Sequence, residues 1–365
     1  MGKRPTLESV EVRGVVMPLR RPVVSKVGQF AEWPLLLIDA RTSDGVVGRA
    51  YLEPYLAQSL RYVAPAVRDL AVTCVGKELD PIARFQANRR ALNLIGYGGV
   101  AAIAVAGLDM ALWDALAKAA GLPLACLLGG SLEPVPAYNS NGLWLTEVAT
   151  LADEAAALVG EGGFGALKLR LGRTRLADDL AAIAEVRRGA GADIKLMIDF
   201  NQGLSLGDAL DRCHALDDQG FYWFEEPIVY DDLAGYAHLT KVLKTPVQLG
   251  ENFYGPRDLL AAVRAEAGVY VMPDLTRIGG VSGWLRSVPI AAAAGLQVST
   301  HLYPEVAAHL MCVTETAHWL EWQDWADPIL AEPFKVREGR IEIPDRPGCG
   351  IDWNEDAVKR YCVDV

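Results

Sequence analysis

The sequence IKLMIDFNQ (residues 194–202) sets a pattern that FYWFEEP (221–227) and VQLGEN (247–252) repeat. Each phrase begins as a short apolar run rich in branched and aromatic residues, which predicts a buried strand. Each run ends on a carboxylate, and these acids follow one another at intervals of 26 residues: Asp199, Glu225 and Glu251. One strand, one helix and two loops fill about that length in a βα unit. The stretch therefore predicts three successive parallel strands.

Acids at the carboxyl ends of successive parallel strands lie side by side on one rim, where α/β barrels carry their chemistry. Three hard oxygen ligands that converge there suit Mg²⁺, which prefers carboxylates and keeps positions open for water or substrate. The alternative is that each acid only caps the helix after its strand. One capping acid is ordinary, but three in register at one period favour a metal site formed by Asp199, Glu225 and Glu251.

Strands and helices alternate from Pro136 onward. Helical patterns such as RLADDLAAIAEVRRGAG (175–191) separate most of the strands, and eight strands with helices between them predict a (β/α) barrel. The eight candidate strands are VPAYNS (135–140), GALKLRL (165–171), IKLMIDF (194–200), FYWFEE (221–226), VQLGE (247–251), VYVMPD (269–274), LQVSTH (296–301) and HWLEW (318–322).

The first part of the chain has a different pattern. Three antiparallel strands are predicted over 10–19, 34–42 and 46–53, and a helical region follows from Ala57 to about Ala120. Strands followed by helices indicate an α+β unit. We place this domain at 1–133, the barrel at 134–326, and a C-terminal tail at 327–365 that packs back on the first domain.

The connection RPVVSKVGQFAEW (21–33) is long for a hairpin and mixes Val, Phe and Trp with charged residues. Loops of that length in compact domains are often lids, so we expect a lid loop over the active site. A disordered surface loop is the alternative.

Composition and charge indicate which partners and which cellular compartment to expect. A net charge of −11 makes a nucleic-acid partner improbable. Six cysteines without paired spacing predict free thiols in a reducing compartment. The N-terminus lacks a signal-peptide core, and the apolar stretch 98–120 contains charged residues, which predicts a buried helix and not a membrane span. We therefore expect a cytoplasmic protein.

Two cations are predicted inside the barrel. In LKLRL (167–171), Lys168 and Arg170 are two residues apart and share a strand face, while the leucines point outward. Buried cations need anions, which the metal carboxylates and an anionic substrate supply. A salt bridge without catalysis is the alternative.

Later strand ends carry an acid–base pair. Asp274 ends the sixth strand and His301 the seventh, 27 residues later, so the aspartate can hold one ring nitrogen and raise the basicity of the other. Glu321 ends the eighth strand and acts as a general acid if protonated. Asn201, two residues after Asp199, is placed to hydrogen-bond a substrate.

These motifs together resemble the enolase superfamily, specifically the mandelate racemase subgroup, and the likeness covers nearly the whole chain. It rests on LKLRL (167–171), MIDFNQ (197–202), WFEEP (223–227), LGEN (249–252), MPDLTRIGGVSGW (272–284), STHLYPE (299–305), HWLEW (318–322) and the helix GLDMALWDALAKAAGLPLACLLGG (107–130). The resemblance implies a (β/α)7β TIM-like barrel closed by an N-terminal α+β capping domain. It also implies a small-molecule carboxylate substrate and a homo-oligomer, from a dimer to an octamer.

The resemblance also implies roles for single residues. One Mg²⁺ binds to the three acids of the opening pattern, and the metal and Lys168 hold the substrate carboxylate. Position 170 is normally a lysine base on one face of the α-carbon, and the His301–Asp274 pair is the base on the other. Glu321 hydrogen-bonds the enolate oxygen.

Two departures from the family pattern bear on the substrate. Arg170 replaces the usual lysine, and a guanidinium is a poor base at neutral pH, so this position disfavours racemisation by two bases. Glu53 stands beneath the lid where the mandelate enzymes are apolar, and Lys26 and Glu32 add polarity, which favours a hydroxylated sugar acid. Against this, three aromatic side chains near the lid can stack on a ring: Phe30, Trp33 and Tyr55.

The leading hypothesis is Mg²⁺-dependent abstraction of the α-proton of a hydroxycarboxylate, in a racemase or epimerase of mandelate racemase type. An acid-sugar dehydratase with His301 as its single base is the alternative. A barrel that binds metal and carboxylate without catalysis is a third reading, supported only by Arg170. A doubly wound nucleotide-binding domain is disfavoured because the chain lacks a Gly-rich strand-to-helix turn of the required form.

Overall fold

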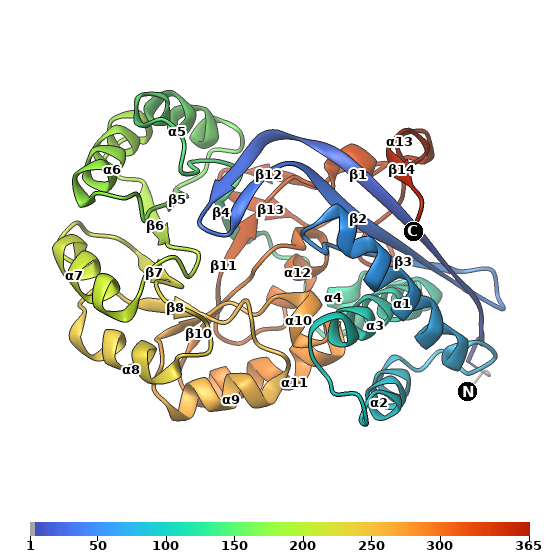
Figure 1. Cartoon of the computed structure of the whole chain (residues 1–365). Helices are drawn as coiled ribbons and strands as arrows, with labels where there is room; N and C mark the ends of the chain where they lie inside the picture. Colours follow the sequence, from blue (N-terminus) through green and yellow to red (C-terminus); the bar gives the residue numbers. More distant parts are fainter. Residues whose placement is uncertain (1–3) are drawn as a thin grey trace.

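The computed structural model describes residues 4–365, so the first three residues of the expected capping domain lie outside it. A closed barrel and an antiparallel sheet with helices stand side by side (Figure 1). The barrel contains eight parallel strands, and its last strand pairs with its first, which confirms the predicted fold class. They are β4 (Val135–Asn139), β5 (Ala166–Arg170), β6 (Lys195–Asp199), β7 (Trp223–Glu225), β8 (Val247–Leu249), β9 (Tyr270–Val271), β10 (Gln297–Ser299) and β11 (Ala317–Trp322).

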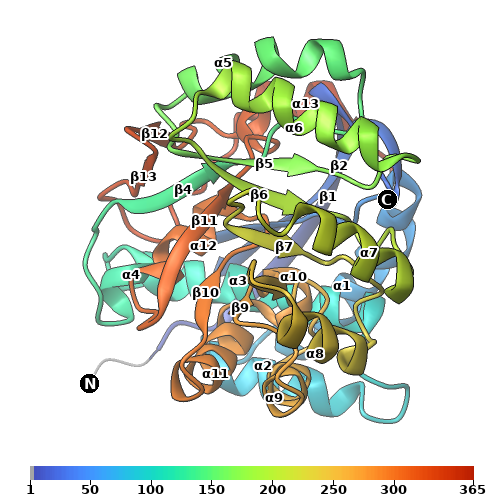
Figure 2. The same cartoon turned by 90° about the vertical axis from the view of Figure 1, so that its left-hand side faces the viewer.

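Helices cover the outside of the barrel, as Figure 2 shows. These helices pack apolar side chains against the barrel. In α7, for example, the buried residues are Ala209, Cys213 and Leu216. The barrel helices are α5 (Leu151–Gly160), α6 (Leu176–Ala190), α7 (Leu206–Leu216), α8 (Leu233–Val242), α9 (Pro256–Arg264), α10 (Leu275–Ile278), α11 (Gly280–Ala293) and α12 (Pro304–Met311).

The barrel interior has an apolar floor. A buried cluster contains Tyr138, Ala166, Met197 and Trp223. Because side chains two residues apart share a strand face, the next inward-facing positions toward the carboxyl ends are polar. Lys168, Asp199 and Glu225 occupy such positions directly above this floor.

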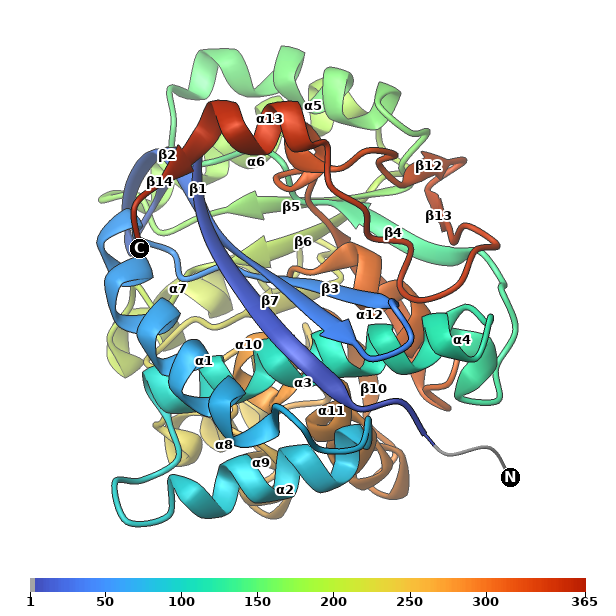
Figure 3. The same cartoon turned by 90° about the vertical axis from the view of Figure 1, so that its right-hand side faces the viewer.

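The capping domain is built on the sheet β1 (Leu7–Ser25), β2 (Gly28–Thr42) and β3 (Val47–Leu52) (Figure 3). Its helices are α1 (Leu60–Cys74), α2 (Pro81–Ala91), α3 (Gly99–Ala119) and the short α4 (Leu124–Leu127). Within the described residues, α3 alone is long and apolar enough to cross a membrane, but 78% of its most apolar window is buried inside the protein. This helix is therefore a core helix, as the sequence predicted.

The prediction of a loop over 21–33 is wrong, because this segment forms a β-hairpin. β1 runs on to Ser25 and β2 begins at Gly28, so only Lys26 and Val27 form the turn of a long hairpin. Val23 pairs with Phe30, and a register irregularity between Pro18 and Val23 absorbs the extra residues. The branched and aromatic residues of this segment continue the sheet, which reaches over the barrel (Figure 1).

The tail joins both domains. β12 (Lys335–Arg337) and β13 (Arg340–Glu342) form a hairpin that pairs antiparallel with β4 of the barrel. After them, α13 (Glu355–Tyr361) and β14 (Cys362–Val363) reach the capping domain, where β14 pairs with β1. The prediction that the tail packs back on the first domain therefore holds only for its last part, which contains α13 and β14.

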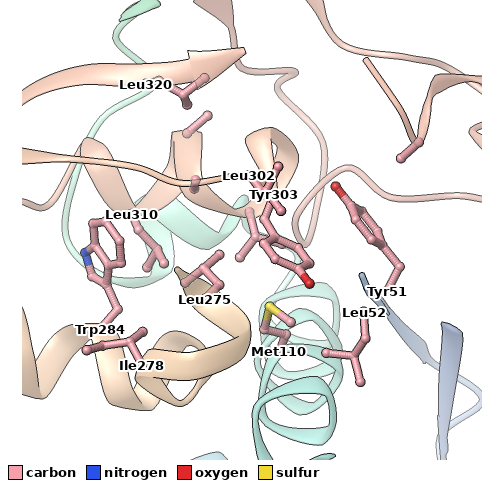
Figure 4. Packing of buried hydrophobic residues seen from close by; sticks show 14 of the residues in the cluster. Tyr51, Leu52, Met110, Leu275, Ile278, Trp284, Leu302, Tyr303, Leu310 and Leu320 are labelled. Carbon is pink, nitrogen blue, oxygen red and sulfur yellow. The ribbon is translucent and has the colours of Figure 1, made fainter. Parts of the chain in front are cut away.

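The capping domain and the barrel share a buried contact beside the site. The rings of Tyr51 from β3 and Tyr303 from the start of α12 stack with centroids 5.3 Å apart. Figure 4 shows this pair above α3, with Met110 and Leu52 beneath it. The Tyr51 hydroxyl donates to Glu305 of α12 at 2.5 Å, so polar and apolar contacts both fix the cap on the barrel.

Candidate active site

A cavity of about 90 Å³ lies between the β1–β2 hairpin and the carboxyl ends of the barrel strands. Ten of the thirteen candidate site residues line it; Glu53, Glu225 and Asp274 lie behind its wall. The lining candidates are Phe30, Trp33, Tyr55, Lys168, Arg170, Asp199, Asn201, Glu251, His301 and Glu321.

Lys168 is the centre of the charged groups. Its buried Nζ lies 2.6 Å from Glu321 Oε1, 2.8 Å from Glu225 Oε1 and 3.4 Å from Asp199 Oδ2. Burial works to lower the pKa of this amine, but these three carboxylates outweigh it and raise the pKa above its usual value. Lys168 is therefore a fixed cation.

The three acids predicted to bind metal meet at this rim. Asp199 and Glu225 are direct neighbours across the β6–β7 pair, and Glu251 follows β8. Burial, and then the charges of Asp199 and the other nearby acids, raise the pKa of Glu225. Across residues 4–365, no three Asp, Glu, His or Cys side chains already surround one metal position. Glu225 is held instead by Lys168, Trp223 Nε1 and Gln248 Nε2.

A fourth acid, Glu226, was not among the candidates. It is buried with a φ of 36°, and both of its oxygens accept from Asn252 Nδ2 at 3.1 Å. Burial and the charge of Glu251 raise its pKa well above the usual value. The doublet in FYWFEEP was the available signal: Glu226 follows the last residue of β7, and its left-handed backbone lets its carboxylate meet Asn252 at the same rim.

Charge shows that the site fits a divalent cation. Carboxyl groups outnumber cationic side chains at this rim, and burial and mutual repulsion raise the pKa of Glu225 and Glu226, an effect that a bound cation would reverse. Excess buried charge is costly unless it is paired, and carboxylate oxygens suit Mg²⁺. The acids are Asp199, Glu225, Glu226, Glu251, Asp274 and Glu321, and the cations are Lys168, Arg170, Arg277 and His301.

The predicted acid–base pair is formed. His301 Nδ1 lies 2.7 Å from Asp274 Oδ2, and the other oxygen of Asp274 accepts from the backbone amides of Thr276 and Arg277 at the start of α10. The second ring nitrogen, Nε2, lies 3.3 Å from Glu251 Oε2. Burial lowers the pKa of His301, but the Glu251 charge and the Asp274 bond outweigh it and raise the pKa to about 10.

Glu321 does not have the protonation state expected of a general acid. It accepts from Ser140 Oγ at 2.7 Å and from the Leu302 amide at 3.0 Å, and it pairs with Lys168. Burial favours its neutral form, yet Lys168 and His301 outweigh burial and lower its pKa to about 2. The side chain is thus an ionised acceptor in each of these contacts.

Arg170 is fixed in place. Its Nη1 donates at 3.0 Å to the carbonyls of both Ser140 and Gly142, and its Nη2 donates to Ser140 Oγ at 2.7 Å. The guanidinium carbon lies 3.8 Å from the centre of the Trp144 ring. Arg170 lines the cavity, but a guanidinium held in this way cannot accept a proton.

The lid residues divide into two groups. Phe30, Trp33 and Tyr55 form an aromatic wall of the cavity, with ring centroids 5.7–6.2 Å apart. Glu53 lies behind that wall, where it accepts from Trp33 Nε1 at 2.7 Å. Lys26 and Glu32 are exposed and lie outside the cavity lining, so the side chains expected to make the lid polar do not do so.

Several further residues form the cavity wall and were not among the candidates. Trp325 packs on Trp33 with centroids 4.2 Å apart, and Gln323 donates to Ser140 Oγ at 3.2 Å. Gln323 and Trp325 continue the alternation of Glu321 on β11, and this spacing of two could have found them. Trp144 lies in the loop after β4, for which the sequence carried no comparable signal.

Asn201 follows β6 with a φ of 44°. Its backbone amide donates to Asp199 Oδ1 at 2.7 Å and its side-chain nitrogen to Oδ2 at 3.0 Å. This asparagine therefore orients a candidate metal ligand while it also lines the cavity.

Comparison with known proteins adds two family matches. Residues 8–129 match the N-terminal domain of the mandelate racemase/muconate lactonizing enzymes, and residues 150–357 match the enolase C-terminal domain-like family.

Solved structures agree with these matches. An enolase from alpha proteobacterium bal199 with bound magnesium is 50% identical, with a TM-score of 0.97 over 98% of this chain and 100% of that one. A Bradyrhizobium enolase in complex with magnesium and mandelic acid is 39% identical, with a TM-score of 0.95 over the full length of both chains.

Among characterised relatives, the L-talarate/galactarate dehydratase of Salmonella typhimurium is 30% identical over 358 residues, which are 96% of this chain and 90% of that protein. The fold, the arrangement of strand-end acids and the two family matches lead to one conclusion. The chain belongs to the enolase superfamily, in the mandelate racemase subgroup.

Proposed function

We propose that this enzyme removes the α-proton of a small hydroxycarboxylate and passes through an enolate. The observation that carries the proposal is that one cavity joins the His301–Asp274 pair to Lys168 and the strand-end acids. Relatives with this architecture include dehydratases, epimerases and racemases, and three similar solved structures contain magnesium.

His301 is the base in this proposal, in the neutral form that a cation held at Glu251 would favour, because the Glu251 charge is the main cause that raises its pKa. Asp274 holds Nδ1, which leaves Nε2 for the substrate and stabilises the imidazolium that forms. Lys168 keeps its charge and binds the substrate carboxylate. Asp199, Glu225 and Glu251 hold Mg²⁺, which when bound supplies positive charge beside that carboxylate and lowers the cost of the enolate. Glu321 supports Lys168 from below as an ionised partner.

A second candidate within this chemistry is dehydration, and Arg170 favours it. Racemisation by two bases needs a proton acceptor on each face of the α-carbon, but the donors and the face of this guanidinium are already engaged by Ser140, Gly142 and Trp144. A single base is sufficient for a lyase. After the α-proton reaches His301, the electron pair forms the enol, the β-hydroxyl leaves as water with the proton from His301, and the enol becomes a 2-keto acid.

Proton exchange tests the assignment of the base. Wild-type protein in D₂O with Mg²⁺ should exchange the α-proton of an accepted acid, measured by NMR, and His301→Asn should lose at least a hundredfold of that rate. His318→Asn is the matched control, because His318 lies at the opposite end of the barrel strands and its loss should leave exchange intact. Equal exchange by wild type and His301→Asn would contradict the proposal.

A further inference from the structure

A second cleft, of about 400 Å³, lies where the capping domain meets the barrel, apart from the candidate active site. One wall is α2 with the turn after it and the other is α11, and these two helices contact each other (Figure 1). Small-molecule sites span about 300–1,000 Å³, so the cleft is large enough for a metabolite. Across residues 4–365 no acid lines it; the lining residues are Gln86, Arg89, Arg90, Asn93, Tyr97 and Arg286.

Three cations of this cleft have no acid to neutralise them. The side chains of Arg89, Arg90 and Arg286 form no ion pair and no hydrogen bond with any group in the part of the chain that the structure describes. Other arginines of the capping domain are neutralised, since Arg13 and Arg49 both pair with Asp39. In a chain with a net charge of −11, three unpaired cations around one cleft indicate a site for an anion.

Aromatic rings hold two of the guanidinium groups in place. The guanidinium carbon of Arg89 lies 4.3 Å from the centre of the Tyr97 ring and 5.6 Å from that of Phe85, which is buried. Arg286 lies 5.8 Å from the same Phe85 ring. A guanidinium stacked on a ring keeps its N–H edge available for a ligand. These donors are therefore oriented before an anion arrives, which lowers the entropic cost of binding.

The end of a helix explains only part of this arrangement. Arg89 and Arg90 lie in the last turn of α2, where the helix dipole favours cations. Arg286 lies in the middle of α11 and gains nothing from that dipole. Burial raises the pKa of Tyr97 to about 12, although the charges of Arg89 and Arg286 both act to lower it, so cations from two domains lie close to one ring. Like charges gathered in this way repel each other, and an anion between them relieves that repulsion.

The donors identify the class of ligand. Arginine N–H groups only donate, and they match pairs of oxygens on a phosphate or a carboxylate. Three of them suit a ligand with two or more negative charges, and the amides of Gln86 and Asn93 can pair with hydroxyl groups on the same molecule. The net charge of −11 opposes a polymeric anion such as a nucleic acid, so the fitting ligand is a small molecule.

We propose that this cleft binds a small, multiply charged oxyanion, a phosphate ester or a polycarboxylate, between Arg89 and Arg90 of the capping domain and Arg286 of the barrel. Among the described residues, none lines both this cleft and the cavity that contains Lys168 and His301. A ligand held here ties α2 to α11 and stabilises the contact between the two domains. The proposal does not depend on the proposed reaction.

Calorimetric titration of the full-length protein tests the site. The probes are inorganic phosphate, ribose 5-phosphate and citrate, each without Mg²⁺ and at an ionic strength kept constant with NaCl, because surface charges respond to salt alone. We expect at least one probe to bind at one site per chain with a Kd of about 1 mM or lower. Tighter binding of the phosphates than of citrate assigns the site to phosphate esters, and the reverse order assigns it to polycarboxylates.

Substitutions on the two walls locate the binding. Arg90→Gln and Arg286→Gln each remove one charge from an exposed side chain, so folding should be unaffected. Each should weaken binding about tenfold, because a hydrogen bond between charged groups is lost. Arg61→Gln is the matched control: Arg61 is exposed on α1 and lies outside the cleft, so the same change in net charge should leave the Kd unaltered.

Three results would overturn the proposal. The first is that none of the probes binds, and the second is that Arg61→Gln weakens binding as much as Arg286→Gln does. The third is that Arg286→Glu changes the oligomeric state in sedimentation while no probe binds, which would assign the arginines to a contact between copies of the chain. Anion binding that Arg286→Gln weakens selectively supports the site whether or not any acid exchanges its α-proton.

Discussion

At the residue scale, Arg170 bears most directly on whether the proposed reaction can use one face of a substrate or both. A lysine at the same place on β5 would carry one flexible amine. The planar guanidinium of Arg170 instead donates to two backbone carbonyls and one hydroxyl and stacks on the face of Trp144. The barrel wall therefore holds Arg170 as a fixed donor. His301 is left as the base of the proposed reaction.

The substitution Arg170→Lys tests this view. Lysine cannot reproduce the three hydrogen bonds or the stacking, so we expect a loss of about 2 kcal/mol in the free energy of unfolding. If position 170 faces the α-carbon opposite His301, as the family pattern implies, the freed amine should allow slow α-proton exchange from the second stereoisomer, as measured by NMR in D₂O.

Arg173→Lys is the matched control for that experiment. Arg173 also donates to backbone carbonyls, at Arg170, Trp144 and Thr146, but its side chain lies outside the cavity. It should lower stability without changing stereochemistry. If Arg170→Lys yields no exchange from the second stereoisomer, Arg170 does not lie on that face of the substrate.

A site residue could be predicted from the sequence wherever a predicted strand ended on an acid or a base. Asp199, Glu225, Glu251 and the His301–Asp274 pair all lie at one rim because parallel strands end together. Sequence could not give the protonation state of Glu321, which depends on a lysine from another strand. It could not give Trp144 either, because this loop residue reaches the cavity only through the tertiary fold.

At the element scale, the β1–β2 hairpin is the part that sequence described least well. Length alone suggested a loop over 21–33, but the cross-strand pairing of Val23 with Phe30 extends the sheet over the barrel. Strand preference outweighed the expectation from connection length, because the sheet offered the segment hydrogen-bond partners. The eight barrel strands were predictable because each apolar run has turn residues on both sides.

The hairpin and β3 are coupled by the Trp33–Glu53 hydrogen bond, which we expect to hold the aromatic wall in place. Glu53→Leu leaves the buried indole N–H without a partner, which costs about 1–3 kcal/mol of stability. The loosened wall should raise KM for the accepted acid several-fold with a smaller effect on kcat, as steady-state kinetics would show.

Glu53→Gln is the conservative variant. Burial raises the pKa of Glu53 to about 8, so its carboxyl group is mostly protonated at pH 7 and the amide resembles it in charge and shape. The amide oxygen still accepts from Trp33, so KM should stay near the wild-type value. A Glu53→Leu protein that is less stable but has an unchanged KM would show that the bond supports the fold alone.

At the scale of the whole molecule, the capping domain, the barrel and the tail all meet around one charged cavity. The stacked pair Tyr51–Tyr303 and the Tyr51–Glu305 bond fix the cap over the barrel, and β14 ties the end of the chain to β1. A sequence read element by element predicts these units and their order. It does not predict the balance of charge between them, which depends on groups brought from seven strand ends, β5 to β11.

That balance predicts how the whole protein responds to metal. The crowded acids of the rim raise the pKa of Glu225 and Glu226, so the metal-free fold retains a repulsion that a divalent ion would relieve. After treatment with EDTA, Mg²⁺ at about 100 times its Kd should stabilise the fold by about 2.7 kcal/mol and raise Tm by about 3–4 °C in calorimetry. The readout needs no substrate.

Two variants show whether the stabilisation arises at the proposed ligands. Asp199→Asn removes one ligand charge and should abolish most of the Mg²⁺-dependent rise in Tm. Glu305→Gln changes another buried carboxyl group, one that accepts from Tyr51 and lies outside the metal cluster, so the rise should persist. The assignment of the strand-end acids as metal ligands would be contradicted if Asp199→Asn left the Mg²⁺-dependent rise in Tm intact, or if Mg²⁺ did not change the Tm of the wild type. The excess of buried negative charge would then have to be neutralised by protons, which the raised pKa values of Glu225 and Glu226 permit.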